Sequence, residues 1–304
     1  MRQRLVLGVG VGGVIVLGLG FVVWAGTQGG FGPHGKARRL LGAASRAAHQ
    51  GKFPDAQAAL EELIGTHPDS PWTDDALVEL TKVYEQQQKL IEARTAARLL
   101  LERFPSSPVV AEAQQSLGRV NVALLFSPML RETDSAYEVK PGDTLGGIAR
   151  ANHTTIELIK RANQLSSDVI RAKQTLKIPK SRFTILVDKS QNQLLLTEND
   201  QFFKLYPVAT GEKGSTPVGT FKIVNKIPNP VWYKQGAVVP ADSPENILGT
   251  RWMGFDKEGY GIHGSVDPGG IGKQVTAGCV RMHNADVEEL FAIVPSSTEV
   301  TIVE

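Results

Sequence analysis

The sequence predicts a multidomain protein with four parts: an N-terminal transmembrane helix, an all-α region, a small β-α-α-β module and a mostly-β sandwich. Three observations predict this division. An apolar run without charges opens the chain, residues 37–126 place apolar residues at helical spacing, and from residue 182 the apolar pattern has period two. A chain of 304 residues is also too long for one hydrophobic core, which supports several domains.

The first part, residues 1–30, is predicted to anchor the chain in a membrane. Residues 5–25 carry no charge, and as a helix they would span about 31 Å, close to the thickness of a bilayer core. Arg2 and Arg4 precede the run and should stay in the cytoplasm. A cleaved signal segment is the alternative, although its apolar stretch is usually shorter. Either case places the remaining chain in the cell envelope, in the periplasm or the extracellular wall space. An uncleaved segment would also anchor it in the inner (cytoplasmic) membrane.

The second part, residues 37–126, is predicted to be a helical spacer with an internal repeat. Residues 51–71 align with residues 88–108 at an offset of 37, so that Lys52 matches Lys89 and Pro68 matches Pro105. A short turn, an Ala-rich helix and a final proline at this period resemble tetratricopeptide-like (TPR-like) helix pairs. A plain helical bundle is the alternative. Under the repeat interpretation, the region would bind a partner protein that the sequence does not identify.

The third part, residues 137–180, is predicted to be a compact module that follows a linker over 127–135. Tyr137 and Val139 alternate as a strand, and Pro141-Gly142-Asp143 forms a turn before a short helix that Asp143 or Thr144 can cap. A second short helix and a closing strand at Leu176 and Ile178 complete the β-α-α-β order.

This module closely resembles a LysM module, through the segments "YEVKPGDTL", "ANQL" and "QTLKIP". The resemblance implies binding of glycans that contain N-acetylglucosamine, chiefly peptidoglycan. It places the sugar groove between two loops, with these candidate contacts: Gly142, Asp143, Thr144, Leu145 and Ile170. A purely structural role in the turn and the helix cap is the alternative for the residues of the first loop.

The fourth part, residues 182–304, alternates as short strands. Residues 182–188 and 192–198 flank a short turn and predict a hairpin, and further strands are expected at 201–210, 218–227 and 298–304. One helix is expected over 284–294. Many short strands with frequent turns predict a β-sandwich or a barrel-like sheet.

A single cysteine, Cys279, lies in "TAGCVRMHN", so the chain cannot form an intramolecular disulfide. A lone cysteine is most often a buried structural residue. Here, however, His263 lies between glycines 16 residues earlier, and Arg281 follows two residues later. An imidazole or a guanidinium can activate a thiol. The net charge of +2 and the ordinary composition give no indication of nucleic-acid binding.

Three motifs, "STPVGTF", "IHG" and "TAGCVRM", together resemble the catalytic domain of L,D-transpeptidases. The resemblance implies a mostly antiparallel β-sandwich and a cysteine-dependent acyltransferase. It makes Cys279 the nucleophile and His263 the general base, with the Gly264 carbonyl orienting the imidazole. The amides of Gly278 and Cys279 would form an oxyanion hole, and Arg281 would structure the loop or help to hold the donor peptide.

The implied reaction is acyl transfer between peptidoglycan stem peptides through a Cys279 thioester, which gives 3→3 cross-links. Attack by water would make an L,D-carboxypeptidase, and attack by a protein lysine would tether that protein to the wall. No metal or organic cofactor is expected, and carbapenems are expected to acylate the thiol. The rival hypotheses are a thiol hydrolase of another amide, such as a protein-to-wall bond, and a non-catalytic scaffold that binds the wall.

Overall fold

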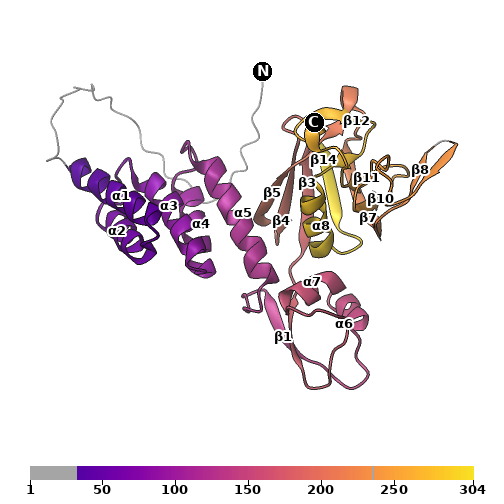
Figure 1. Ribbon diagram of the computed structural model, residues 1–304, viewed down its shortest axis with the longest axis horizontal. Coiled ribbons are helices and arrows are strands. Elements are labelled where there is room, and N and C mark those ends of the chain that lie inside the picture. Colours follow the sequence, from indigo (N-terminus) through magenta and orange to yellow (C-terminus); the bar gives the residue numbers. More distant parts are fainter. Residues whose placement is uncertain (1–32, 235) are drawn as a thin grey trace, which may run out of the picture.

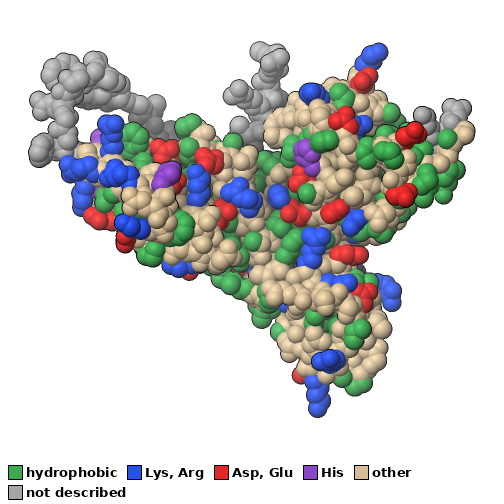
Figure 2. Space-filling view, viewed as in Figure 1, with side chains coloured by type: hydrophobic (Ala, Val, Ile, Leu, Met, Phe, Trp, Pro, Cys, Tyr) green, Lys and Arg blue, Asp and Glu red, His purple; other side chains and the backbone are tan. Residues whose placement is uncertain are grey.

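The computed structural model describes residues 33–234 and 236–304. The expected membrane helix over residues 1–30 lies outside these ranges. Within them, no helix is both long enough and apolar enough to cross a membrane. The described chain forms a helical region, a small module and a β-rich domain (Figure 1). In Figure 2 the small module protrudes from the body of the molecule, and basic and acidic side chains are interspersed over the visible face.

The helical region consists of five helices that pack successively. They are α1 (Pro33–His49), α2 (Phe53–Thr66), α3 (Thr73–Gln86), α4 (Leu90–Arg103) and α5 (Val110–Phe126). The internal sequence repeat falls on α2 and α4. Lys52 and Lys89 precede these helices with nearly the same backbone angles, φ −85° and ψ 62° or 67°. The repeat therefore corresponds to a repeated local structure, while its TPR-like character remains a prediction.

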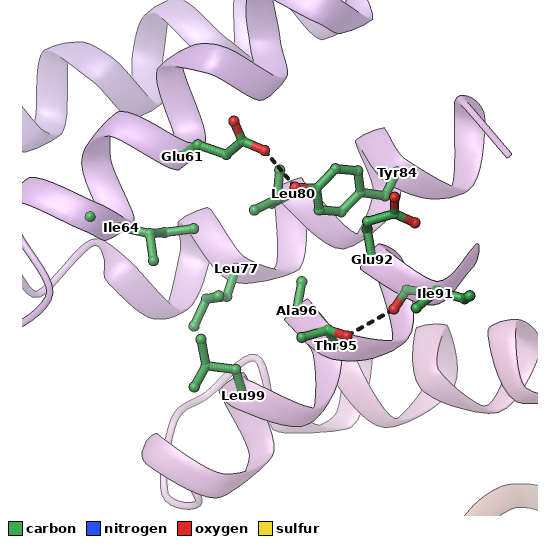
Figure 3. A pocket seen from close by; sticks show the side chains of 11 residues that line it. Glu61, Ile64, Leu77, Leu80, Tyr84, Ile91, Glu92, Thr95, Ala96 and Leu99 are labelled. Carbon is green, nitrogen blue, oxygen red and sulfur yellow. Dashed lines mark hydrogen bonds between the residues drawn. The ribbon is translucent and has the colours of Figure 1, made fainter. Parts of the chain in front are cut away.

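A cavity of about 370 Å³ opens between α2, α3 and α4 (Figure 3). Leucine and isoleucine supply five of its eleven lining residues, and Glu61 and Glu92 are the charged residues there. The Tyr84 hydroxyl donates a hydrogen bond of 2.6 Å to Glu61 Oε1, which fixes the phenol ring beside the opening. The side chains that line the cavity do not identify a ligand.

The small module has the predicted β-α-α-β order. It comprises β1 (Asp134–Glu138), α6 (Leu145–Ala151), α7 (Ile156–Ala162) and β2 (Thr175–Pro179), with β1 and β2 antiparallel. Thr144 and Thr155 cap the two helices by accepting backbone N–H bonds at 3.1 and 2.8 Å. Its strand begins at Asp134, inside the stretch that the sequence predicts to be a linker.

The β-rich domain is built on one eight-stranded sheet, in the order β13-β11-β10-β7-β14-β3-β4-β5. The strands are β3 (Phe183–Asp188), β4 (Gln193–Glu198), β5 (Gln201–Pro207), β7 (Gly219–Pro228), β10 (Arg251–Phe255), β11 (Gly261–His263), β13 (Val280–Arg281) and β14 (Glu299–Val303). The predicted hairpin of β3 and β4 is confirmed. Most pairs are antiparallel, but β3 with β14 and β11 with β13 are parallel.

The long strand β7 links the two halves of this sheet. Its first residues pair with β14, and its later residues pair with β10. Side chains from both halves share one core with α8 (Asn284–Ile293), whose Val287, Leu290 and Ile293 are fully buried. Two short pairs complete the domain: β6 (Thr210–Gly211) with β12 (Gln274–Thr276), and β8 (Trp232–Lys234) with β9 (Ala237–Val239). The expected sandwich is thus a single sheet whose two halves enclose a common core.

Helix α5 belongs to the helical region by sequence but also packs into the core of the β-rich domain. Val122 and Leu125 lie in the same buried cluster as the strands of that domain. Asn121 Nδ2 donates a bond of 2.9 Å to the Phe203 carbonyl of β5. Leu158 of the small module joins the same cluster. The three regions are therefore joined by a shared hydrophobic core, which a simple spacer would not require.

A buried ion network closes this junction. Arg131 pairs with Asp134 at 2.8 Å and with Glu198 at 2.7 Å, and all three side chains are almost inaccessible to solvent. Lys177 of β2 pairs with Asp134 at 3.2 Å and donates to carbonyls at the end of α5, including that of Leu124 at 2.9 Å. A cation at a helix C-terminus can satisfy the free carbonyls of that helix. Lys177 therefore stabilises the contact between the small module and α5.

Candidate functional site

The pairing of β11 with β13 brings the predicted catalytic residues together. These strands are parallel, with Ile262 opposite Val280 and His263 opposite Arg281. Ile262 and Val280 are fully buried in the domain core. Side chains alternate between the faces of a strand, so His263 and Arg281 lie on the opposite face. Cys279 comes directly before β13. Arg281 influences the pKa of both His263 and Cys279, so the imidazole and the thiol both lie near its charge.

The imidazole of His263 is held in one orientation and in one tautomer. Its Nδ1 lies 2.7 Å from the Gly264 carbonyl, and the residue is only 3% exposed. A carbonyl can only accept, so Nδ1 carries the proton and Nε2 keeps its lone pair. Burial lowers the pKa of His263 from 6.5 to about 4; the bond to Gly264 opposes this shift, and the charge of Arg281 adds to it. His263 is therefore a neutral base at physiological pH.

The thiol of Cys279 is half-buried and protonated. Its Sγ donates a long bond of 3.5 Å to the Gly259 carbonyl. Burial raises the pKa of Cys279 above its ordinary value, although the Gly261 amide and Arg281 oppose this shift. The resting pair is thus a neutral thiol and a neutral imidazole. Such a thiol needs a base to remove its proton before it can attack.

Gly278 must be a glycine because of the close packing before the thiol. Its φ is +137°, and a Cβ there would lie 2.7 Å from Cε1 of Tyr260. Its amide donates to Thr276 Oγ1 at 3.2 Å, and that hydroxyl donates to the Cys279 carbonyl at 2.7 Å. To stabilise an oxyanion, the Gly278 amide would have to weaken or break its bond to Thr276 Oγ1. The Thr276 hydroxyl therefore competes with the predicted oxyanion for this donor.

Arg281 lies in the same row as His263. Its backbone pairs with Ala209 through two bonds of 2.8 and 2.9 Å. Its side-chain Nε is buried and has no hydrogen-bond partner among the described residues. Arg281 therefore braces the strand and supplies positive charge to the site.

Asn284 is a part of the site that the sequence did not identify. It is the first residue of α8. Its Oδ1 accepts backbone N–H bonds from Thr250 at 3.2 Å and Ser265 at 3.0 Å. These bonds hold the chain that follows His263 and Gly264. The available signal was its position five residues after Cys279 in "TAGCVRMHN".

Four of the predicted glycan contacts, Gly142 to Leu145, lie at the start of α6, and Ile170 lies on the loop between α7 and β2. Three of the four have structural roles. Asp143 Oδ2 accepts from the Tyr137 hydroxyl and the Lys140 amide, both at 2.8 Å. Thr144 caps α6, and Leu145 is 2% exposed within the core of the module. Gly142 is exposed, with φ +88°, and Ile170 packs partly buried against the same core. Sugar contact at these positions remains a prediction, and Leu145 exposes almost no surface for it.

Comparisons with known proteins agree with this geometry. Residues 182–302 match the L,D-transpeptidase catalytic domain (YkuD), and residues 137–179 match the LysM domain. A protein of Bacillus licheniformis whose name assigns it to the L,D-transpeptidases as YkuD is 40% identical over 174 residues. This alignment spans 97% of that protein and 55% of the present chain. The chain belongs to the L,D-transpeptidase family.

Two further similarities were found. A Bacillus subtilis protein with the same family name, YkuD, is 37% identical over 97% of its own length and 55% of this chain. A solved L,D-transpeptidase from Mycobacterium smegmatis is 16% identical, with a TM-score of 0.35, covering 43% of this chain and 64% of that chain. A LysM domain beside an L,D-transpeptidase domain indicates action on peptidoglycan in the cell envelope.

Proposed function

We propose that this L,D-transpeptidase forms 3→3 peptidoglycan cross-links through a thioester on Cys279. The observation that carries the proposal is the position of Cys279 and His263 near the same Arg281 charge, with Nδ1 of His263 bonded to the Gly264 carbonyl at 2.7 Å. That bond leaves Nε2 as the base. The Gly264 carbonyl thus takes the place that a carboxylate holds in other triads.

In the first step, Cys279 Sγ gives its proton to His263 Nε2 and attacks the carbonyl carbon of the third stem residue. The tetrahedral oxyanion is stabilised by the Cys279 amide, with Gly278 as a second donor if its bond to Thr276 yields. One such donor typically contributes about 10²–10³ in rate. The C–N bond to the terminal D-alanine then breaks, its nitrogen takes the proton from His263, and D-alanine leaves.

In the second step, an amine of a neighbouring stem attacks the thioester. His263 takes a proton from that amine, the C–S bond breaks, and the sulfur regains a proton as the cross-link forms. Water or a protein lysine could replace the amine with the same residues in the same roles. We propose the stem amine as the acceptor, because the LysM module would hold the enzyme on a substrate rich in such stems.

The other parts of the chain receive supporting roles in this proposal. The LysM module docks on glycan strands through the loops around Gly142 and Ile170. The helical region, as TPR-like repeats, offers a surface to a partner protein, and residues 1–30 hold the chain at the membrane. The domain divisions are those given by the sequence: 37–126, 137–180 and 182–304.

The test is incubation of the full-length protein with disaccharide-tetrapeptide muropeptides, followed by mass spectrometry of the products. The proposal expects release of D-alanine and a 3→3 dimer, both lost in Cys279→Ala. Release of D-alanine with tripeptide monomers alone would identify a carboxypeptidase instead. Wall binding without any turnover would support the non-catalytic scaffold.

A further inference from the structure

Trp252 lies beside His263 on the face of the sheet that carries the thiol. In the strand register Trp252 is opposite His263 on one side and opposite Ile227 on the other. The next residue, Met253, is fully buried in the core, so Trp252 faces the opposite way. The resulting row runs across four strands from Arg281 through His263 and Trp252 to Ile227, which is 44% exposed.

The indole of Trp252 is stacked on the imidazole of His263, and a hydrogen bond to Asn225 holds the indole in place. The two ring centroids are 6.0 Å apart, with an angle of 23° between the planes. Trp252 Nε1 donates a bond of 3.0 Å to Asn225 Oδ1, which also accepts from the Gly254 amide at 3.1 Å. The amide side chain of Asn225 therefore fixes the indole in its plane.

Two glycines let the indole lie flat on the sheet next to the thiol. A Cβ on Gly254 would lie 2.8 Å from Trp252 Nε1, and a Cβ on Gly261 would lie 3.0 Å from its Cζ2. The Gly261 amide in turn lies beside the Cys279 sulfur, because its hydrogen bond lowers the pKa of the thiol. The indole thus covers the backbone between Asn225 and the thiol, and any larger residue at either glycine would displace it.

From this arrangement we propose that Trp252, pinned by Asn225, is a positioning residue. Its indole fixes the ring plane of His263 and keeps water from the imidazole, so that Nε2 remains aimed at the thiol. This inference rests on the proposed transpeptidase function and adds residues outside the three sequence motifs.

The charges around the imidazole are few. On β13 the ring faces Cys279 and Arg281, and on β10 it faces only the uncharged Trp252. Arg251 of β10 turns away, with its guanidinium over the Phe291 ring of α8. Burial is the largest cause of the lowered pKa of His263, and the stacked indole of Trp252 covers one side of the ring, so the proposal assigns part of this burial to Trp252. Removal of the indole should let water reach the ring and raise that pKa.

The experiment measures the rate of carbapenem acylation of Cys279 from pH 4 to 8 by intact mass, in the full-length protein. The variants are Trp252→Leu, Trp252→Phe and Asn225→Ala, with Trp72→Leu in the helical region as the control. For Trp252→Leu we expect a fall of about tenfold or more at pH 7, within the range of general-base effects. In the plot of acylation rate against pH, the pH at which Trp252→Leu loses activity on the acid side should also rise by about one unit or more, towards the ordinary pKa of histidine.

Trp252→Phe keeps an aromatic ring and should lose activity on the acid side at the same pH as the wild type, with a modest loss of rate. Asn225→Ala should resemble Trp252→Phe, and Trp72→Leu should match the wild type in both properties.

A Trp252→Leu profile that is lower but not shifted would overturn the inference, because it indicates a structural role only. If Trp252→Leu does not fold, an Asn225→Ala rate equal to that of the wild type would also overturn it. A wild-type protein that takes no adduct would instead refute the proposed function itself.

Discussion

The junction between the three regions and the thiol site both bury ionisable groups, but in opposite ways. At the junction, burial would raise the pKa of Asp134, yet the bonds and charge of Arg131 keep it below its ordinary value. Burial likewise opposes the charge of Arg131, whereas Asp134 and Glu198 raise its pKa. At the thiol site, burial dominates, and both His263 and Cys279 are shifted towards their neutral forms.

This difference distinguishes the ionisable groups that stabilise the fold, at the junction, from those that the proposed reaction uses, at the thiol site. The charges of Arg131 and Asp134 compensate one another, although burial still lowers the pKa of Lys177. Removal of Arg131 would leave its acidic partners buried without their main cation. The charge of Arg281 only partly offsets the effect of burial on Cys279, and it adds to the effect of burial on His263, so both groups stay neutral at a cost in stability. Such unpaired, shifted groups are typical of functional sites. Four predictions follow from this contrast, in order of decreasing effect.

Loss of Arg131 should destabilise the protein most. Arg131→Leu leaves Asp134 and Glu198 buried without their main cation, and breaking a buried pair in this way costs about 3–5 kcal/mol. The control is Arg182→Leu, because the pair of Arg182 with Asp200 is largely exposed. Exposed pairs contribute about 0–1 kcal/mol. Urea unfolding measures both variants, and equal losses would contradict a special role for the junction.

Acid should destabilise the wild type through His263. Its pKa is lower in the folded protein, about 4 against 6.5, so the unfolded chain binds the extra proton between these values. The free energy of unfolding therefore falls as pH falls from 6.5 to 4, by up to about 3 kcal/mol. Asp134, with a lowered pKa, loses its contribution only below its ordinary value of 3.8.

His263→Gln cannot titrate and should lose less stability than the wild type between pH 6.5 and 4. Denaturant unfolding at several pH values measures the difference between the two proteins. The same pH dependence in both would show that His263 is not the buried neutral base described here.

The bond between α5 and β5 should have a smaller effect. Asn121→Ala leaves the Phe203 carbonyl without this donor, at a cost of about 1–3 kcal/mol. Unfolding should remain a single transition for the helical region and the β-rich domain, because Val122 and Leu125 still join their cores. Two well-separated transitions in the wild-type protein would contradict the shared core.

Removal of the thiol should hardly change stability. Cys279→Ala deletes a half-buried sulfur whose bond to the Gly259 carbonyl is 3.5 Å long. We expect a change within about 1 kcal/mol in the free energy of unfolding, since surface and weakly bonded positions tolerate substitution. A large loss of stability would indicate a structural cysteine.

Local patterns predicted much of the fold. The β3 and β4 hairpin, the β-α-α-β module and the repeated helices each depend on residues close in sequence. The parallel pairing of β3 with β14 could not be predicted in this way, because its strands are more than a hundred residues apart. The junction was also missed, since Arg131 and Asp134 look like charged linker residues until Glu198 is placed beside them.

The candidate site also contains residues that local sequence motifs predicted and residues that only the strand register brings together. The motifs pointed to Cys279 and His263, because short signatures carry the residue types that thiol chemistry needs. Trp252 and Asn225 carry no such signature, and their relation to His263 depends on the register of three strands. That register shifts at an irregularity between Gly254 and Phe255, which no local pattern discloses.

The central claim is that a neutral His263 activates the Cys279 thiol for acyl transfer. Intact-mass analysis after exposure to a carbapenem tests it most directly, with wild type, Cys279→Ala and His263→Gln compared at pH 7. The account predicts one adduct on the wild type, none on Cys279→Ala, and formation at least about a hundredfold slower on His263→Gln. An unmodified wild type, or an adduct that forms equally fast on His263→Gln, would contradict it.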